Sequence, residues 1–201
     1  MLNVVNIAYA LEEISGQNVF HYGDKHFSFN IPQGWHKLPD SVLESRIKDL
    51  ELHRKEPLTQ KPILAFNRIG AVHPFEVPYF TISAGTFVID DSEINRILNS
   101  LQKTMGKAAR KEEGSLYKDT LIESPTYDKE KHIATIAVDS KLTNNKVTLD
   151  IKLLTVFFFY KDGVVVITFY LPLDGSSKYI PIVKSLINTF KFDSGYEYTS
   201  R

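Results

Sequence analysis

Residues 146–171 read KVTLDIKLLTVFFFY, then KDG, then VVVITFYL, and they form the part of the chain from which the fold is best predicted. Val, Ile, Thr, Phe and Tyr dominate both arms, and these residue types favour a pleated, half-buried strand. Gly163 ends the connecting turn, where it can take the positive φ that short hairpins require. The charged turn also interrupts the apolar run before it reaches the roughly 20 residues of a membrane-spanning helix. We therefore predict a central β-hairpin with the other elements packed around it, and no integral membrane segment.

The first arm of this hairpin changes its alternation pattern near Leu153 and Leu154. Apolar residues at 147, 149, 151 and 153 share one face of the strand, whereas those at 154, 156 and 158 share the other. A β-bulge, or a change from one-sided to two-sided burial, would explain the switch. We predict that Phe158 and Ile167 face the interior beneath a C-terminal helix, because a hairpin alone needs a further layer to cover it. The helix would contribute Ile180, Val183 and Ile187, and the competing inward pair is Phe157 and Phe159.

The remaining elements are placed by periodicity and turn residues. Asp40 or Ser41 caps the first helix, where Ser41-x-x-Glu44 has the spacing of a capping box. Strands are predicted at 19–22, 27–31, 63–69, 77–89, 116–123 and 133–142, and helices begin near residues 40, 90 and 180. Residues 106–114 are mostly charged and are expected to be solvated, and residues 128–131 are expected to form a polar connection between two strands. Short turns make neighbouring strands antiparallel, so the predicted fold class is α+β, an antiparallel β-sheet covered by helices.

The composition is that of one ordinary globular domain. The chain has 201 residues, of which 43% are hydrophobic and 24% charged, and this length suits a single domain. We divide it into an N-terminal segment at 1–18, an α+β domain at 19–192 and a flexible tail at 193–201. Lys and Arg total 24, as do Asp and Glu, and this balance argues against nucleic-acid binding. Cysteine is absent, which excludes disulfides, thiolate metal sites and cysteine nucleophiles.

The N-terminus has two interpretations. Its first ten residues, MLNVVNIAYA, are mostly apolar and end in Ala8-Tyr9-Ala10, a small-x-small pattern that signal peptidase accepts. The first basic residue is Lys25, so the basic region of a complete signal peptide is missing. One interpretation is the remnant of a signal peptide whose upstream part was lost to a late start codon, which implies a periplasmic or extracellular protein. The other is a short helix or strand at the start of a cytoplasmic protein.

Three stretches of the chain together have a recognisable pattern. Residues 27–35, FSFNIPQGW, form an aromatic strand followed by Pro and Gly-Trp, and the hairpin at 146–171 and residues 187–192, INTFKF, close the domain. These stretches resemble the early signature, the closing hairpin, and the last helix and short strand of the PsbP-like superfamily, which includes the Ran-binding Mog family. The resemblance spans residues 19–192 and implies an antiparallel sheet sandwiched between helices. The superfamily includes photosystem accessory subunits, exported bacterial proteins and a nuclear GTPase cofactor, so the shared fold does not imply one function.

Two sequence patterns could carry chemistry. SLQK at 100–103 matches the S-x-x-K of penicillin-recognising enzymes, in which the Ser attacks a carbonyl and the Lys moves its proton. The S-D-N and K-T-G partners are missing, and Ser100 and Lys103 lie on the polar side of an amphipathic helix, so a solvated face is favoured. His21, Asp24 and His26 could converge across the first hairpin turn as metal ligands. Turns are also rich in polar residues for conformational reasons, and that structural role is favoured here.

Other conspicuous residues favour structural roles. His36 is expected at the sheet edge, and residues 82–86, ISAGT, lack the spacing and the Lys of a phosphate-binding loop. Trp35, the only tryptophan, is expected to anchor the core, with a surface groove as the alternative. Four basic residues form a cluster whose charge Glu112 and Glu113 offset. The cluster suits a solvated loop, or a surface that binds an acidic partner. Its members are Lys103, Lys107, Arg110 and Lys111.

From these patterns we infer a non-catalytic accessory or protein-binding module, exported, that presents a loop surface or groove to a protein partner. The alternative is a hydrolase-type enzyme whose site is assembled from residues distant in sequence. No motif specifies a catalytic residue or a cofactor, and the sequence indicates neither the identity of the partner nor the oligomeric state.

Overall fold

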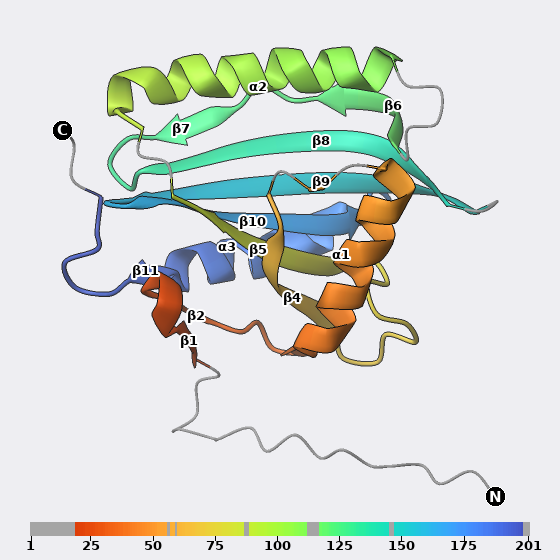
Figure 1. The fold of residues 1–201 in the computed structure, drawn as a ribbon, viewed down its shortest axis with the longest axis horizontal. Coiled ribbons are helices and arrows are strands. Elements are labelled where there is room, and N and C mark those ends of the chain that lie inside the picture. Colours follow the sequence, from red (N-terminus) through yellow and green to blue (C-terminus); the bar gives the residue numbers. More distant parts are fainter. Residues whose placement is uncertain are drawn as a thin grey trace, which may run out of the picture.

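The computed structural model describes residues 19–55, 57–58, 60–86, 89–111, 117–144 and 147–198. These residues form two antiparallel sheets and three α-helices (Figure 1). The strands are β1 (Val19–Tyr22), β2 (Phe27–Asn30), β3 (Trp35–Lys37), β4 (Pro62–Arg68), β5 (Tyr79–Gly85), β6 (Tyr117–Ile122), β7 (Thr126–Asp128), β8 (Ile133–Asn144), β9 (Val147–Tyr160), β10 (Gly163–Pro172) and β11 (Lys191–Phe192). The helices are α1 (Asp40–Arg54), α2 (Asp91–Lys111) and α3 (Ile180–Thr189).

The predicted hairpin lies at the centre of the larger sheet. That sheet has eight strands in the order β3-β4-β5-β10-β9-β8-β6, and β7 pairs with β8 beside β6. The smaller sheet has the order β1-β2-β11 and therefore joins the two ends of the domain. Neighbouring strands pair antiparallel throughout, and helices cover both faces of the larger sheet. The predicted α+β class is confirmed.

The pattern switch in β9 comes from two-sided burial and not from a bulge. The registers of β9 with β8 and with β10 run without interruption past Leu153 and Leu154. From Val156 onward, alternate side chains face opposite layers: Phe158 is 3% exposed on one face and Phe159 is 6% exposed on the other. Both of the competing faces are therefore covered, because the hairpin lies between two layers.

One face of the large sheet, here called the α3 face, carries the main aromatic core. Phe158 and Ile167 lie on it as predicted, together with Phe66 and Phe80 of the neighbouring strands. The Phe158 ring stacks on Phe190 at the end of α3, with ring centroids 3.9 Å apart. The stripe of α3 differs in part from the prediction. Its buried residues are Val183 and Leu186, Ile187 packs against the same cluster, and Ile180 is not among the cluster's residues.

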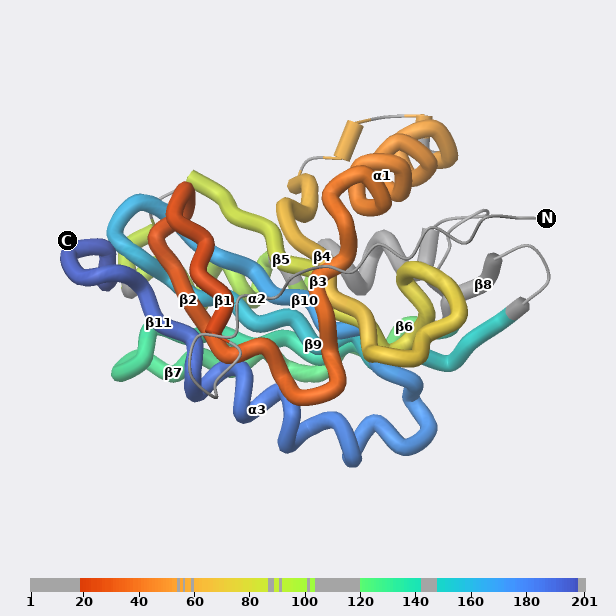
Figure 2. Tube along the Cα trace, turned by 90° about the horizontal axis from the view of Figure 1, so that it is seen from below, coloured from red at the N-terminus to blue at the C-terminus, as the bar shows by residue number. Residues whose placement is uncertain are grey.

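The opposite face, here called the α2 face, is covered by two helices. Ile94 and Leu98 of α2 pack on β8, β9 and β10, where Phe159 is buried. Leu43 of α1 packs on Ala65 of β4, so α1 and α3 lie on opposite sides of the strands (Figure 2). Pro181 occupies the first turn of α3, where a missing N–H is tolerated. No helix among the described residues is long and apolar enough to span a membrane.

Several local predictions need correction. Helix α1 begins at Asp40 after Pro39 without a side-chain cap, so the Ser41 capping box does not form. Helix α2 continues through the charged stretch to Lys111. Strand β7 was not predicted; it reaches the first residue of the polar connection predicted at 128–131, and it forms because β8 is long enough to pair with β6 and β7 in succession. Strand β5 spans only Tyr79–Gly85 of the predicted 77–89.

Gly163 is required for a different reason from the one predicted. Its φ is not among the positive values, which belong to Gly34, Gly70, Gly175 and Gly195 among the described glycines. A Cβ at Gly163 would lie 1.9 Å from the carbonyl oxygen of Gly85. Because β5 and β10 approach so closely there, only a residue without a side chain fits.

Candidate functional site

The strongest candidate for a binding surface is the 69–78 loop, which connects β4 to β5. Asn67, near the end of β4 and only 1% exposed, holds the loop through two side-chain hydrogen bonds. Its Nδ2 donates to the carbonyl oxygen of His73 at 3.1 Å, and its Oδ1 accepts from the N–H of Phe75 at 3.2 Å. A buried side-chain amide is costly unless its polar atoms are paired. Here the pairing fixes the far side of the loop to the sheet.

Glu76 holds the tip of the same loop from within. Its Oε2 accepts from the N–H of Val72 at 2.6 Å and from the N–H of His73 at 3.3 Å. The N–H of Glu76 donates to the carbonyl oxygen of His73 at 3.2 Å. Hydrogen bonds to a carboxylate are stronger than those between neutral groups. The turn at Val72 is therefore fixed although it lies at the surface.

Phe75 takes a backbone conformation that its side-chain contacts stabilise. Its φ is +61°, in the left-handed region that bulky residues rarely adopt. The Phe75 ring meets Tyr79 edge to face with centroids 5.5 Å apart, and the Arg46 guanidinium of α1 lies 5.8 Å above it. Strained conformations of this kind persist where the surrounding structure imposes them, and they are frequent at functional sites.

The ordered loop exposes two aliphatic side chains. Ile69 is 63% exposed and Val72 is 77% exposed. The N–H of Ile69 donates to the carbonyl oxygen of Gly34 at 2.7 Å, which ties the loop to the turn before β3. In Figure 2 the loop projects from the end of β4. Ile69 and Val72 are therefore each open to solvent on a backbone that the fold holds in place.

Sequence reasoning missed this surface. It assigned Ile69 to a strand and gave residues 70–76 no function, because neither Asn67 nor Glu76 belongs to a motif. The available signal was a pair of aliphatic residues set among Gly70, Pro74 and Pro78, which punctuate a loop. Apolar residues in such a segment have no strand or helix periodicity to bury them.

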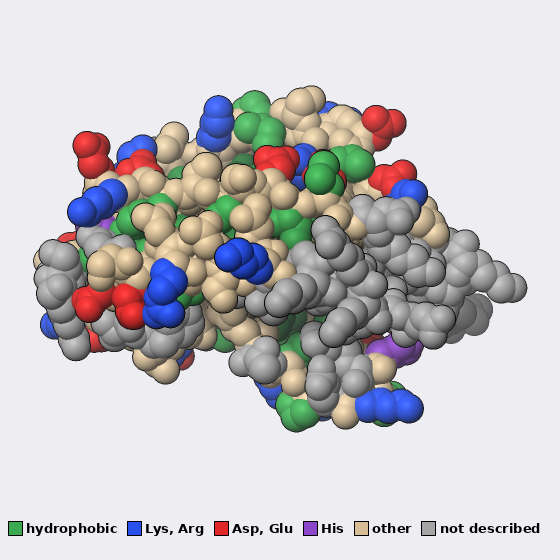
Figure 3. Space-filling model, turned by 90° about the horizontal axis from the view of Figure 1, so that it is seen from above, with side chains coloured by type: hydrophobic (Ala, Val, Ile, Leu, Met, Phe, Trp, Pro, Cys, Tyr) green, Lys and Arg blue, Asp and Glu red, His purple; other side chains and the backbone are tan. Residues whose placement is uncertain are grey.

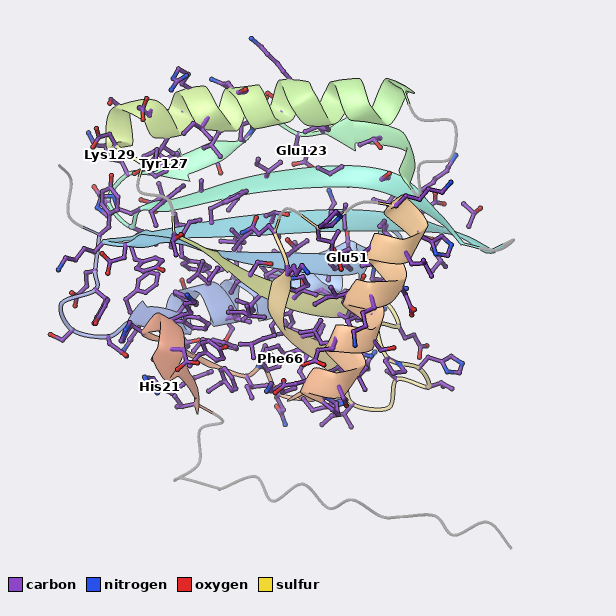
Figure 4. All side chains as sticks on the ribbon, viewed as in Figure 1. His21, Glu51, Phe66, Glu123, Tyr127 and Lys129 are labelled. Carbon is purple, nitrogen blue, oxygen red and sulfur yellow. The ribbon has the colours of Figure 1, made fainter. Side chains whose placement is uncertain are left out.

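Two of the three residues considered as metal ligands contact a residue from the far end of the chain, Asp193. His21 Nε2 lies 3.2 Å from both carboxylate oxygens of Asp193, and His26 Nδ1 lies 3.6 Å from one of them. Asp24 is exposed and takes no part in these contacts. Among the described residues, no group of three or more His, Asp or Glu side chains has a geometry that could hold a metal ion. Figure 4 shows His21 on the small sheet.

Residues 193–198, which belong to the segment predicted to be a flexible tail, make contacts with the domain. The Tyr196 ring stacks on His26 with centroids 3.6 Å apart, and its carbonyl oxygen accepts from the N–H of Lys161 at 3.3 Å. The Tyr198 hydroxyl donates to the carbonyl oxygen of Ile89 at 2.9 Å. This segment packs on the domain because its two tyrosines find aromatic and polar partners there. Residues 199–201 lie outside the described residues.

A second polar cluster joins three strands at another part of the molecule. Lys152 Nζ lies 2.8 Å from Glu123 Oε1 and 2.7 Å from Asp139 Oδ1. Burial acts to lower the pKa of Lys152, but hydrogen bonds to Asp139 and Glu123 outweigh it and raise the pKa above its ordinary value. Figure 4 shows Glu123 well away from His21. The triad holds the end of β6 against β8 and β9, which is a structural role.

Two further pKa shifts also reflect structural contacts. The pKa of Glu51 is lowered mainly by a hydrogen bond from Lys61 and secondly by one from the N–H of Leu58. These contacts join α1 to residues that precede β4. Burial, and then the charge of Asp162, raise the pKa of Tyr160.

The structure separates the remaining predicted residues. Ser100 and Lys103 are exposed on α2, as the solvated-face interpretation expects, and His36 is exposed on edge strand β3. The side chains of Lys107, Arg110 and Lys111 lie outside the part that the structure describes. Acidic and basic side chains are interspersed on the side of the molecule that carries α2 (Figure 3). Trp35 is 5% exposed, with its ring 5.3 Å from Phe80, and it is the predicted core anchor.

An antiparallel sheet between helical layers defines the class as an α+β sandwich. The chain is similar to the solution structure of cyanobacterial PsbP (CyanoP) from Synechocystis sp. PCC 6803, with a TM-score of 0.55 and 6% identity over 96% of this chain and 98% of that chain. The particular fold is therefore PsbP-like, as the sequence predicted. It also matches the crystal structure of LpqN, involved in cell envelope biogenesis of Mycobacterium tuberculosis, with a TM-score of 0.49 and 13% identity over 89% and 91% of the two chains. No protein-family model and no curated protein matches.

Proposed function

We propose that this protein is an exported, non-catalytic accessory module that binds a protein partner through the 69–78 loop. The observation that carries the proposal is the exposure of Ile69 and Val72 on a loop that Asn67 and Glu76 hold in one conformation. Loops positioned by a rigid sheet are the usual place for binding residues. Aliphatic side chains gain free energy when a partner removes them from water.

The charge distribution supports a protein partner over a nucleic acid. The whole chain has a formal net charge of zero, whereas nucleic-acid binding rests on an excess of Lys and Arg along one surface. Contacts at a protein interface contribute most where the partner excludes water from them, so the two aliphatic side chains contribute to binding only when a partner encloses them.

A capture experiment tests the proposed surface. The double variant Ile69→Ser with Val72→Ser removes both aliphatic side chains. The matched control is Leu52→Ser with Leu121→Ser, because these residues are 78% and 65% exposed outside the loop. Immobilised wild-type protein and the control should retain the same protein from native extract, and the loop variant should lose it. Equal retention by the loop variant would refute the role of the loop.

The proposed export rests on the apolar run that ends in Ala8-Tyr9-Ala10. Signal peptidase cleaves after a small-x-small pattern of this kind. Sequencing the N-terminus of the protein isolated from its native cell should give Leu11 as the first residue, in the extracytoplasmic fraction. An intact Met1 on a protein in the cytoplasmic fraction would contradict export.

A further inference from the structure

We propose that the C-terminal segment, residues 193–198, docks on the domain in a pH-dependent way, more tightly at mildly acidic than at mildly alkaline pH. The chain has six histidines, and three of them contact this one segment: His21, His26 and His132. Histidine is the side chain that ordinarily changes its charge between pH 5 and 8. This property does not depend on partner binding through the 69–78 loop.

The C-terminal segment is held by few contacts. None of its residues is buried: Asp193, Tyr196 and Tyr198 are partly buried and the others are exposed. Two backbone hydrogen bonds join it to the domain, from the N–H of Asp193 to the carbonyl oxygen of His26 at 2.8 Å and from the N–H of Lys161 to the carbonyl oxygen of Tyr196 at 3.3 Å. In Figure 1 the segment leads from β11 toward the end of β9. Segments of this kind open at a low cost in free energy, so a small change in contact energy shifts the docked fraction.

The Asp193 carboxylate contacts two of the histidines. His21 Nε2 is 3.2 Å from both of its oxygens, and His26 Nδ1 is 3.6 Å from one of them. When either imidazole takes up a proton, a contact between a neutral ring and an anion becomes an ion pair, which is stronger. The His21 and His26 side chains are 56% and 38% exposed, so each ion pair alone contributes little. Both nevertheless act on the same short segment and in the same direction.

The two tyrosines of the segment add contacts with the same dependence on charge. The Tyr196 ring stacks on His26 with centroids 3.6 Å apart, and the Tyr198 ring lies 4.2 Å from the His132 ring. A cation over the face of a Tyr ring is attracted to its π electrons. The Tyr127 hydroxyl, 3.2 Å from His132 Nδ1, can accept a hydrogen bond from the protonated ring. Protonation of His26 and His132 therefore strengthens both ring contacts.

The backbone at His26 and His132 supports a role for their side chains. Their φ angles are +56° and +53°, in the left-handed region that glycine adopts at no steric cost. A Gly would fill both turn positions without strain, but it would leave Tyr196 and Tyr198 without the rings that they contact. Residues held in this region are frequent where the local conformation has a function.

Other charged side chains near these contacts do not change the direction of the effect. Carboxylates and ammonium groups ordinarily keep their charge between pH 5 and 8. Lys191 shares the face of His21 but lies two strands away, at about 10 Å, so the nearer Asp193 dominates. The remaining charged neighbours are Asp24 and Lys25 in the turn before His26, Lys131 with its partner Asp128 beside His132, Lys161 and Asp162 beside Tyr196, and Glu197 within the segment.

The added attraction exists only while the histidines are charged and Asp193 is ionised. It is present at pH below the range in which histidine ordinarily titrates and is lost as the pH rises through that range. It also weakens below about pH 4, where carboxylates ordinarily take up protons. Exposed contacts of this kind should together change the ratio of docked to free segment about fivefold.

Amide hydrogen exchange of the full chain measures the docked fraction. The N–H groups of Lys161 and Asp193 have their acceptors only while the segment is docked. Each rate is divided by the intrinsic rate at the same pH, which removes the pH dependence of exchange itself. Protection of these two amides should be about fivefold higher at about pH 5.5 than at about pH 8, relative to the N–H of Leu38, which donates to the carbonyl oxygen of Ala65 at 2.8 Å. Equal relative protection at the two pH values would overturn the proposal.

Matched variants separate the charge of the histidines from their contacts. Gln keeps a polar side chain that cannot take up a proton at these pH values, so replacing the three contacting histidines should reduce the change to less than about twofold. This variant carries His21→Gln, His26→Gln and His132→Gln. The control replaces the other three histidines, all exposed, and should keep the fivefold change: His36→Gln, His53→Gln and His73→Gln. A pH effect that survives the first variant, or disappears in the control, would overturn the assignment of the histidines.

A further variant tests the anion and covers the case in which the triple variant fails to dock its C-terminal segment. Asp193→Asn keeps the shape of the side chain and all three imidazoles but removes the negative charge. The change in protection should fall to about twofold, which is the part that the ring contacts contribute. The full fivefold change in Asp193→Asn would show that the carboxylate is not the charge partner of the histidines and would overturn the proposal.

Discussion

Truncating Phe158 to Ala tests the layered core most directly. Phe158 is 3% exposed in β9, opposite Val165 of β10 and Ile133 of β8. Its ring stacks on Phe190 with a centroid separation of 3.9 Å and an angle of 22° between the ring planes. The substitution therefore removes a contact between the central hairpin and the end of α3.

Two contributions set the size of the effect. Deleting a buried Phe side chain costs about 3–5 kcal/mol, because the cavity closes only in part. About 0.5–1.5 kcal/mol of that loss is the stacked aromatic pair. Strand β9 pairs with a strand on each side at Phe158, so the cavity left by the substitution can close only in part. We therefore expect the free energy of unfolding to fall by about 4 kcal/mol, a large share of a domain's usual stability.

Equilibrium unfolding in urea, followed by circular dichroism, measures this loss as a fall in the midpoint at constant slope. The matched control is Phe157→Ala, the next residue, which is partly buried on the opposite face. We expect Phe157→Ala to cost about 1–3 kcal/mol. A loss below about 1 kcal/mol at Phe158, or a larger loss at Phe157 than at Phe158, would refute the assignment of the main core to the α3 face.

Three other substitutions test separate contacts. Gly163→Ala should cost about 1–3 kcal/mol in urea unfolding because its Cβ would meet Gly85, whereas Gly23→Ala, with 3.8 Å to its nearest neighbour, should cost little. The raised pKa of Lys152 means that its ion pairs stabilise the fold below the ordinary value of 10.5 and that this contribution is lost as pH rises through the folded-state pKa. The difference in melting temperature between wild type and Lys152→Met should therefore vanish in strongly alkaline buffer, and a constant difference would contradict the triad. Asp193→Ala should lower the free energy of unfolding by less than about 1 kcal/mol, since its partners are exposed. The same substitution should speed the removal of the last residues by carboxypeptidase. An unchanged digestion rate would show that the His21 and His26 contacts do not hold this segment.

The elements that depend on local periodicity could be predicted from the sequence alone. The β-branched and aromatic arms at 146–171, the alternation of Phe27 and Phe29, and the apolar stripe of α2 each specify a strand or a helix with a buried face. Short turns between successive strands made the antiparallel α+β class predictable. The burial of Trp35 was also predictable, because a large aromatic ring that follows a Pro and Gly turn usually anchors the core.

What the sequence left open depends on which distant segments meet. Alternation along β9 reports its two faces but not the layers that cover them, so the choice between a bulge and two-sided burial needed α2 and α3 in place. The partner of His21 is Asp193, 172 residues away, and the fit of Gly163 depends on a carbonyl of β5. The candidate binding surface was equally hidden, because Ile69 and Val72 become a surface only when Asn67 and Glu76 fold the loop that exposes them. Local sequence determines which side chains a strand places on each face, whereas the packing of segments that are distant in sequence decides what those side chains contact.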